Sequence, residues 1–269
     1  RMTEDSLWLG PLRRPMKLVM MAFGALTAVV YVILAGNALI SEDAIGMHEM
    51  IRPEGRPMVQ LMLFAVFGLL LSASIYLSDT KGGIETAPTG PFDIVSLVCS
   101  RIAMIAVGLI VVVMFYEVVS RYVFEAPTLW ANELSLWIAA FVFLFAGQYA
   151  MQQRSHIRIY VLYDVMPRWM QKTADVISVL LICLFFFALL WGGYNDAERR
   201  FLRMETFGTA WDPPIPGILK PTVLLIIFLV TLQSISNLIA DWNKAPEHHG
   251  PDDIDEEEIE TLRRTLEDK

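Results

Sequence analysis

Six long apolar segments constrain this chain more than any other feature of its sequence. Five of them contain no charged residue: Leu18–Ile40, Met58–Leu77, Leu134–Gln153, Val176–Asn195 and Pro221–Ala240. A helix needs about 20 apolar residues to cross the hydrocarbon core of a bilayer. A chain that is 55% hydrophobic is also too apolar for a soluble domain of this length. Each segment is therefore expected to span a membrane, and the first is too long for the apolar region of a cleavable signal peptide.

The sixth segment, Ile94–Val119, is less regular because it carries a charge near each end. Arg101 and Glu117 flank an uncharged centre, Ile102–Tyr116. A long arginine side chain can reach the membrane surface from within a helix, and Glu117 is expected near the opposite surface. The sequence thus predicts an all-α, polytopic membrane protein with six transmembrane helices.

The distribution of basic residues predicts how these helices are oriented. Six spans place both chain ends on the same side of the membrane. Segments on that side contain 13 Lys and Arg residues, and the segments on the other side contain 6 Arg residues and Lys220. Because basic residues accumulate on the cytoplasmic side, both the N and the C terminus are expected in the cytoplasm.

Composition divides the chain into five parts. We expect a cytoplasmic N-terminus at 1–17, a two-helix hairpin at 18–77, a linker rich in Gly, Pro and Thr at 78–93, a four-helix domain at 94–242 and an acidic cytoplasmic tail at 243–269. The formal net charge of −8 arises mainly in the tail, because residues 241–269 hold 11 acidic residues and 4 Lys and Arg. This acidity argues against a nucleic-acid partner, which requires a basic surface.

Charged and aromatic residues cluster where the third and fourth spans are expected to meet. Glu117 and Arg121 are four residues apart, so they share a helix face and can form an ion pair. Trp130 and Glu133 lie on one stripe at the start of the fourth span. The cluster can be an ion pair and an aromatic anchor at the membrane surface, or it can be a docking surface for another protein.

For several other charged residues, the sequence allows two different interpretations of the role. Arg101 can reach lipid phosphate or contact a partner helix, and His156, beside Arg154, can lie in an exposed loop or contact a lipid head group. The predicted external loop 196–217 can be an ordinary structured loop or a docking site for a soluble partner. Its candidate docking residues are Arg199, Arg200, Arg203 and Trp211.

The sequence lacks the motifs of several functional classes. It contains no Gly-rich phosphate loop and no HExxH motif, and its four histidines are not at metal-ligand spacing. No catalytic residue, metal site or cofactor is therefore expected. No span carries an ionisable residue at its centre, whereas transporters usually need such a group or a broken helix. The chain is a poor candidate for moving a polar solute alone.

The region between the third and fourth spans resembles a known family. The sequence "RYVF" from Arg121 is followed by Pro127, Trp130 and Glu133, and then by Gly147, Arg154 and the pair His156–Ile157. This ordered pattern resembles the small membrane subunit of tripartite ATP-independent periplasmic (TRAP) transporters. The resemblance covers Ile94–Trp242, and the two N-terminal spans and the acidic tail are additions to the usual four-helix unit.

The resemblance implies a non-catalytic subunit of a secondary transporter in the bacterial inner membrane. A periplasmic binding protein captures an organic anion, and a large, sodium-coupled membrane subunit of the elevator type carries it inward. The small subunit is a scaffold for the large one and helps the binding protein to dock. On this view Arg101, Glu117, Arg121, Trp130, Glu133, Arg154 and His156 contact partners or lipids, and sodium binds in the large subunit.

Two other functions remain open at this point. The chain can be the membrane anchor of a different complex, or a six-helix transporter that needs no partner. Haem-binding anchors use histidines within spans, and none of the four histidines lies in a span. A self-sufficient transporter requires a polar path through the helices.

Overall fold

The described part of the protein is entirely helical. The structure, a computed structural model, describes residues 6–41, 44–80, 85, 88–154 and 166–243, and it contains no strand in these ranges. Six helices are long and apolar enough to cross a membrane, which confirms the predicted fold class. They are α1 (Arg13–Ile40), α3 (Pro57–Ser78), α4 (Pro91–Tyr122), α5 (Ala131–Gln152), α7 (Arg168–Leu202) and α8 (Ile215–Asp241), joined by short η1 (Gly10–Leu12) and α2 (Met47–Met50). The orientation of the termini stays a prediction.

Several helices extend beyond the apolar segments that predict them. The 35-residue α7 continues through Asp196–Leu202, which the sequence analysis assigned to a loop. Asp196 and Arg200 form an ion pair one turn apart at 3.0 Å, and such pairs stabilise a polar helix end. The loop between α7 and α8 is consequently shorter than predicted, at residues 203–214. Helix α4 has 32 residues and a length of about 48 Å, so its charges lie well within one continuous helix.

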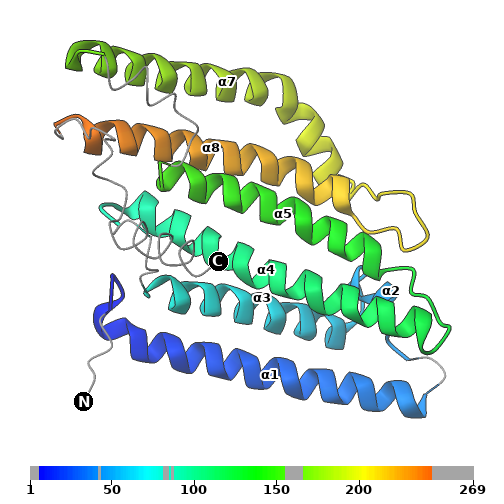
Figure 1. Cartoon of the computed structure of the whole chain (residues 1–269). Helices are drawn as coiled ribbons and strands as arrows, with labels where there is room; N and C mark the ends of the chain where they lie inside the picture. The colour runs from blue at the N-terminus through cyan, green and yellow to red at the C-terminus, as the bar shows by residue number, and fades with distance from the viewer. Residues whose placement is uncertain (1–5, 42–43, 81–84, 86–87, 155–165, 244–269) are drawn as a thin grey trace, which may run out of the picture.

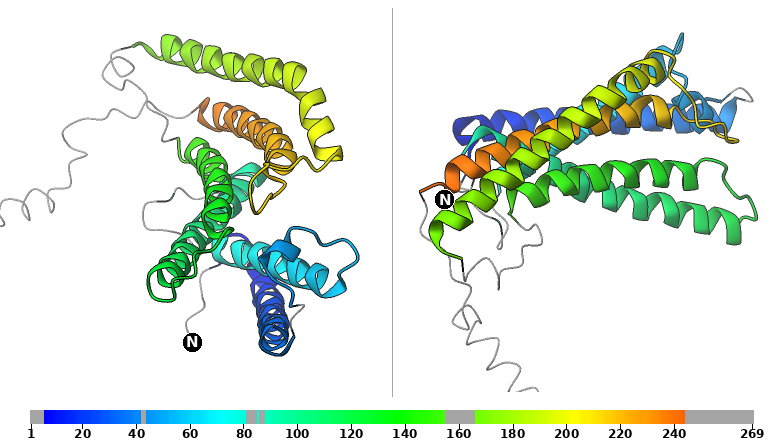
Figure 2. Two further views of the ribbon diagram at one scale, coloured as in Figure 1. Left: turned by 90° about the vertical axis from the view of Figure 1, so that its right-hand side faces the viewer. Right: turned by 90° about the horizontal axis from the view of Figure 1, so that it is seen from above.

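The six long helices form an open row and not a closed bundle. Figure 1 shows them side by side in the order α1, α3, α4, α5, α8, α7. The closest pairs are α1 with α3, α4 with α5, and α7 with α8, and α3–α4 and α5–α8 contacts join these pairs. The end view in Figure 2 shows α7 set apart at one edge of the row, where it packs mainly on α8. Most helices therefore expose apolar surface on two sides.

Close packing holds the N-terminal hairpin together. A Cβ atom on Gly68 of α3 would lie 2.4 Å from Cε1 of Phe23 on α1, so only glycine allows this approach. The Phe23 ring also lies edge-on to Phe64, with ring centroids 5.6 Å apart. Helix α3 in turn packs on α4. The two helices that precede the resembling region are thus packed against it.

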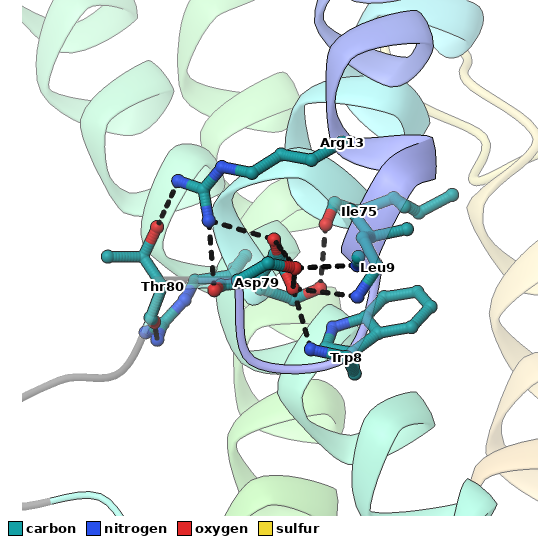
Figure 3. Close-up of polar contacts among 10 residues, drawn as sticks. Trp8, Leu9, Arg13, Ile75, Asp79 and Thr80 are labelled. Carbon is teal, nitrogen blue, oxygen red and sulfur yellow. Dashed lines mark hydrogen bonds and ion pairs between the residues drawn. The ribbon is translucent and has the colours of Figure 1, made fainter. Parts of the chain in front are cut away.

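Asp79, directly after α3, binds the segment 6–13 to the end of this helix (Figure 3). Its side chain is fully buried, although the sequence analysis placed it in a linker. Arg13 donates to Oδ2 of Asp79 at 2.8 Å and forms an ion pair with it. The other donors to this carboxylate are the backbone N–H groups of Trp8 and Leu9, each at 2.8 Å, and the hydroxyl of Ser6, at 2.7 Å.

This hydrogen bonding determines the charge state of Asp79. Burial by itself raises the pKa of the carboxyl group, but the backbone donors, the hydroxyl and the guanidinium together hold the pKa below its usual value. Asp79 is therefore ionised in the folded protein at neutral pH. Because its pKa is lower in the folded than in the unfolded state, its contribution to stability is present above the unfolded pKa. That contribution is lost as the pH falls through the folded pKa.

We expect Asp79→Asn to lower the stability of the purified protein by about 3–5 kcal/mol, because Arg13 loses its buried ion-pair partner. Thermal unfolding in mild detergent at pH 7 measures the loss. The difference between Asp79→Asn and the unsubstituted protein should shrink as the pH falls below 4. Glu54→Gln, at an exposed site, is the matched control and should leave stability unchanged. An equal effect of both substitutions would contradict the role assigned to Asp79.

Candidate functional site

The bend between α4 and α5 is built on Glu117. This side chain is 4% exposed and accepts a hydrogen bond from Nε of Arg121 at 2.9 Å, which confirms the predicted pairing. It also accepts bonds from the backbone N–H of Thr128, at 3.0 Å, and from the Thr128 hydroxyl. Glu117 thus connects the end of α4 with the residues just before α5. Arg121 keeps half of its side chain exposed.

Trp130 and Glu133 extend this bend toward neighbouring segments. The Trp130 ring stacks on Tyr116 of α4, with centroids 5.6 Å apart. Glu133, in the first turn of α5, accepts a 2.6 Å hydrogen bond from the hydroxyl of Thr209 in the loop between α7 and α8. The two residues predicted to share one stripe therefore have different contacts within the chain.

Trp211 joins the loop between α7 and α8 to the loop between α1 and α3. It is 3% exposed, and its Nε1 donates to the carbonyl oxygen of Met47 in α2 at 2.9 Å. Arg52 and Asp212 lie 4.0 Å apart across the same junction. We refer to the end of the row that carries the loops 44–56, 123–130 and 203–214 as the loop end, and to the opposite end as the terminal end. The first and the last of these loops, which are far apart in the sequence, are in contact at the loop end.

The three arginines predicted to form a docking loop lie at the end of α7, and they differ in their contacts. Arg200 pairs with Asp196 and with Glu205, so its charge is compensated within the chain. Arg199 and Arg203 are exposed and form no ion pair with the described residues. Whether these arginines contact a partner stays a prediction, but only Arg199 and Arg203 offer uncompensated charge.

Arg101 is held by polar groups of its own chain. Its side chain is 10% exposed, and its guanidinium forms a 2.6 Å ion pair with Glu85 and donates to the carbonyl oxygen of Thr80 at 3.1 Å. Glu85 also accepts a 3.1 Å bond from the hydroxyl of Tyr149 on α5. An acidic residue of the segment between α3 and α4 therefore compensates the charge of Arg101 within the chain, and a contact with a partner or with lipid stays a prediction.

At the terminal end, Arg154 connects the end of α5 to the end of α8. Its Nη2 donates to Oδ1 of Asp241 at 2.9 Å, and Arg168 at the start of α7 donates to the carbonyl oxygen of Asp241 at 3.2 Å. Asp241 thus connects three helices. His156 and the acidic tail from residue 244 onward lie outside the described residues.

A buried polar cluster between α4, α5 and α8 was missed by the sequence analysis. Gln148 donates to the Ser96 hydroxyl at 2.8 Å, and Ser96 donates to Oε1 of Gln233 at 3.0 Å. Gln233 donates in turn to Asp93 at 2.6 Å and to Asn237 at 2.9 Å. All the members except Asn237 are buried. The sequence signal for this cluster was the presence of Gln148 and Gln233 within apolar spans. A buried side-chain amide requires a hydrogen-bond partner in the protein interior.

The described residues contain no group of three or more His, Cys, Asp and Glu side chains that could hold a metal ion. The two cysteines, Cys99 and Cys183, are unpaired. Several buried polar groups in the described region, among them Ser96, Gln148 and Gln233, hydrogen-bond one another across helices. The arrangement can hold helices in a fixed register and present surfaces to other molecules.

Comparison with known proteins identifies the family to which the last four helices belong. Residues 110–244 match the family described as "Tripartite ATP-independent periplasmic transporters, DctQ component", which covers half of the chain and α5, α7, α8 and the second half of α4. The chain belongs to this DctQ family. The resemblance stated from Arg121 onward is confirmed, and α1 and α3 lie outside the matched residues.

Two curated relatives of this DctQ-family chain carry transporter names. The C4-dicarboxylate TRAP transporter small permease protein DctQ of Vibrio cholerae is 26% identical over 113 residues, which are 42% of this chain and 48% of that protein. The sialic acid TRAP transporter permease protein SiaT of Haemophilus influenzae is 27% identical over 116 residues, or 43% of this chain and 19% of that protein. This chain therefore spans about half of the first relative and about a fifth of the second. No solved structure matches it.

The bend at Glu117 and the loop from Arg203 lie in the region that matches the family. The Asp79 cluster and the Trp211 contact to Met47 involve the additional helices. This DctQ-family chain is thus a membrane subunit in which two further helices are packed and hydrogen-bonded to the shared unit.

We expect Glu117→Ala to destabilise the protein by about 1–3 kcal/mol, because the part-buried N–H and hydroxyl of Thr128 lose their acceptor. Arg121→Ala should have a smaller effect, because Arg121 is half exposed and Glu117 keeps its bonds to Thr128. Thermal unfolding in detergent compares the two variants. A larger loss for Arg121→Ala would contradict this reading of the bend.

Trp211→Phe removes the hydrogen bond to Met47 while retaining a large ring, so the loop of α2 should open more often. The expected cost is about 1 kcal/mol. Hydrogen exchange measured by mass spectrometry should be faster in the segment 44–56 and unchanged in α4. Trp191→Phe, at a ring that is 92% exposed, is the control. Unchanged exchange in both variants would refute the proposed link between the two loops.

Proposed function

We propose that this chain is the small, non-catalytic subunit of a TRAP-type secondary transporter in the bacterial inner membrane, with both termini in the cytoplasm. It is a scaffold for a large, sodium-coupled membrane subunit that takes up an organic anion. It also helps a periplasmic binding protein to dock at the loop end. Sodium and substrate bind to the large subunit. Membership of the DctQ family supports this role, and the names of both relatives contain an organic acid.

The observation that carries the proposal is the exposed apolar face of α7. Ile177, Leu184 and Trp191 are spaced seven residues apart, so they lie on one stripe of the helix, and they are 50%, 65% and 92% exposed. Phe186 and Leu190, on another face, are directed at α8. Helix α7 at the edge of the row can therefore pack on α8 with one face and on a second membrane protein with the other (Figure 2).

The polar contacts within the chain support a scaffold more than a transport path. Arg101 is paired with Glu85, and Glu117 with Arg121 and Thr128, so these groups are engaged in holding segments together. At the loop end, the contacts of Thr209 with Glu133 and of Trp211 with Met47 hold the loop between α7 and α8 against the start of α5 and against α2. A docking site benefits from this rigidity, because less conformational entropy is lost on binding.

The test is affinity purification of the tagged chain from its native membrane in mild detergent, with quantitative mass spectrometry of co-purified proteins. We expect a large polytopic membrane protein in equal amount. In the double variant Leu184→Ala, Trp191→Ala, the amount of this co-purified protein should fall about tenfold, because two large apolar contacts are lost.

The matched control carries Tyr31→Ala and Leu39→Ala on α1, at the opposite edge of the row, where both residues are also exposed. It should retain the partner in full. Equal retention in both double variants would refute the role of α7. Purification of the chain without any large membrane protein, together with solute flux in liposomes that contain this chain only, would overturn the scaffold function itself.

A further inference from the structure

An apolar groove runs between α7 and α8 near the loop end. It has a volume of about 360 Å³ and is lined by Phe186, Leu190 and Phe201 of α7 and by Pro221, Leu225 and Phe228 of α8. Both helices are candidate membrane spans. The groove is therefore a recess in a surface that faces the hydrocarbon region or a neighbouring protein.

Two close contacts bracket the groove along the helices. At one end the Phe186 and Phe228 rings lie 5.6 Å apart. At the other end Gly217 approaches the chain so closely that a Cβ atom there would lie 3.1 Å from the carbonyl oxygen of Arg200. Figure 1 shows α7 bending toward α8 before this second contact. The helices are thus held together at both ends of the groove.

A second hollow lies beside the groove and is polar. It is lined by Asn195, Glu198, Arg199, Leu202 and Arg203, and Glu198 lines both recesses. Arg199 and Arg203 form no ion pair with the described residues, unlike their neighbour Arg200. Two arginines and one glutamate give the hollow a formal charge of +1.

The position of the two recesses matches the two parts of a membrane lipid. The apolar groove extends along the spans, whereas the hollow is at the last turns of α7, where charged side chains follow the apolar part of the helix. Arginine donates paired hydrogen bonds to phosphate oxygens, and it keeps its charge at any physiological pH. A single phosphodiester carries a charge of −1, which complements the charge of the hollow.

We propose that the groove and the hollow together bind one anionic phospholipid, with an acyl chain against Phe186, Leu225 and Phe228 and the phosphodiester at Arg199 and Arg203. The lipid fills the recess between α7 and α8 and leaves the outward stripe of α7 free for a protein partner. Arg199 and Arg203 are then lipid ligands and not contacts of a soluble binding protein.

Native mass spectrometry of the purified full chain, titrated with phosphatidylglycerol in detergent, tests the proposal without requiring any transporter partner. We expect one tightly bound lipid, and at least about tenfold weaker binding in the double variant Arg199→Gln, Arg203→Gln, because the charge-assisted hydrogen bonds are lost. The control Arg52→Gln, Arg56→Gln removes two arginines from another loop at the same end and should bind phosphatidylglycerol normally. Equal binding by both double variants would overturn the assignment of the headgroup site.

A second variant tests the groove itself. Leu225→Trp should fill the recess and weaken binding of phosphatidylglycerol about tenfold, since the acyl chain loses its place. Thermal unfolding of all variants establishes that they are folded. Phosphatidylethanolamine that binds as tightly as phosphatidylglycerol would refute the charge argument. If Leu225→Trp left lipid binding intact but released a co-purified membrane protein, the groove would be occupied by a partner helix and the proposal would be wrong.

Discussion

The absence of water in the hydrocarbon core determines most of this structure. A backbone polar group in that region must be satisfied within its own segment, and an α-helix satisfies all of them. Each of the six spans can therefore form without its neighbours. This explains why the helices can lie in an open row, where α7 packs mainly on α8, and still be long and continuous.

The lack of water also raises the free-energy cost of burying a charged side chain. In this chain, charged side chains are paired with groups from distant segments. Asp79 binds Arg13, Arg101 binds Glu85, and Arg154 binds Asp241. Each pair joins segments that are separated in the sequence. For the two pairs that are largely buried, Asp79–Arg13 and Arg101–Glu85, loss of one partner is strongly destabilising, because the remaining charge stays buried without a partner. These contacts therefore help to determine which segments lie together.

In an open row, helix surfaces that would be buried in a closed bundle stay exposed. One face of α7 is turned to α8, and another remains exposed, as the proposed scaffold function requires. The loop end adds a second surface, in which the additional α1–α3 hairpin takes part through α2 and Trp211. The two helices outside the DctQ-family match are thus part of the same structural unit as the matched region.

The sequence by itself determined the number of spans, the helical class and the family, because each of these depends on local composition or on an ordered motif. It also predicted the Glu117–Arg121 pair, which follows from helical spacing alone. It did not predict the burial of Asp79, the partner of Arg101 or the contact of Trp211 with Met47. Those contacts join residues from 16 to 164 positions apart, and no local pattern encodes them. Only the packing of the helices decided them, because a buried polar group pairs with whatever the fold brings within reach.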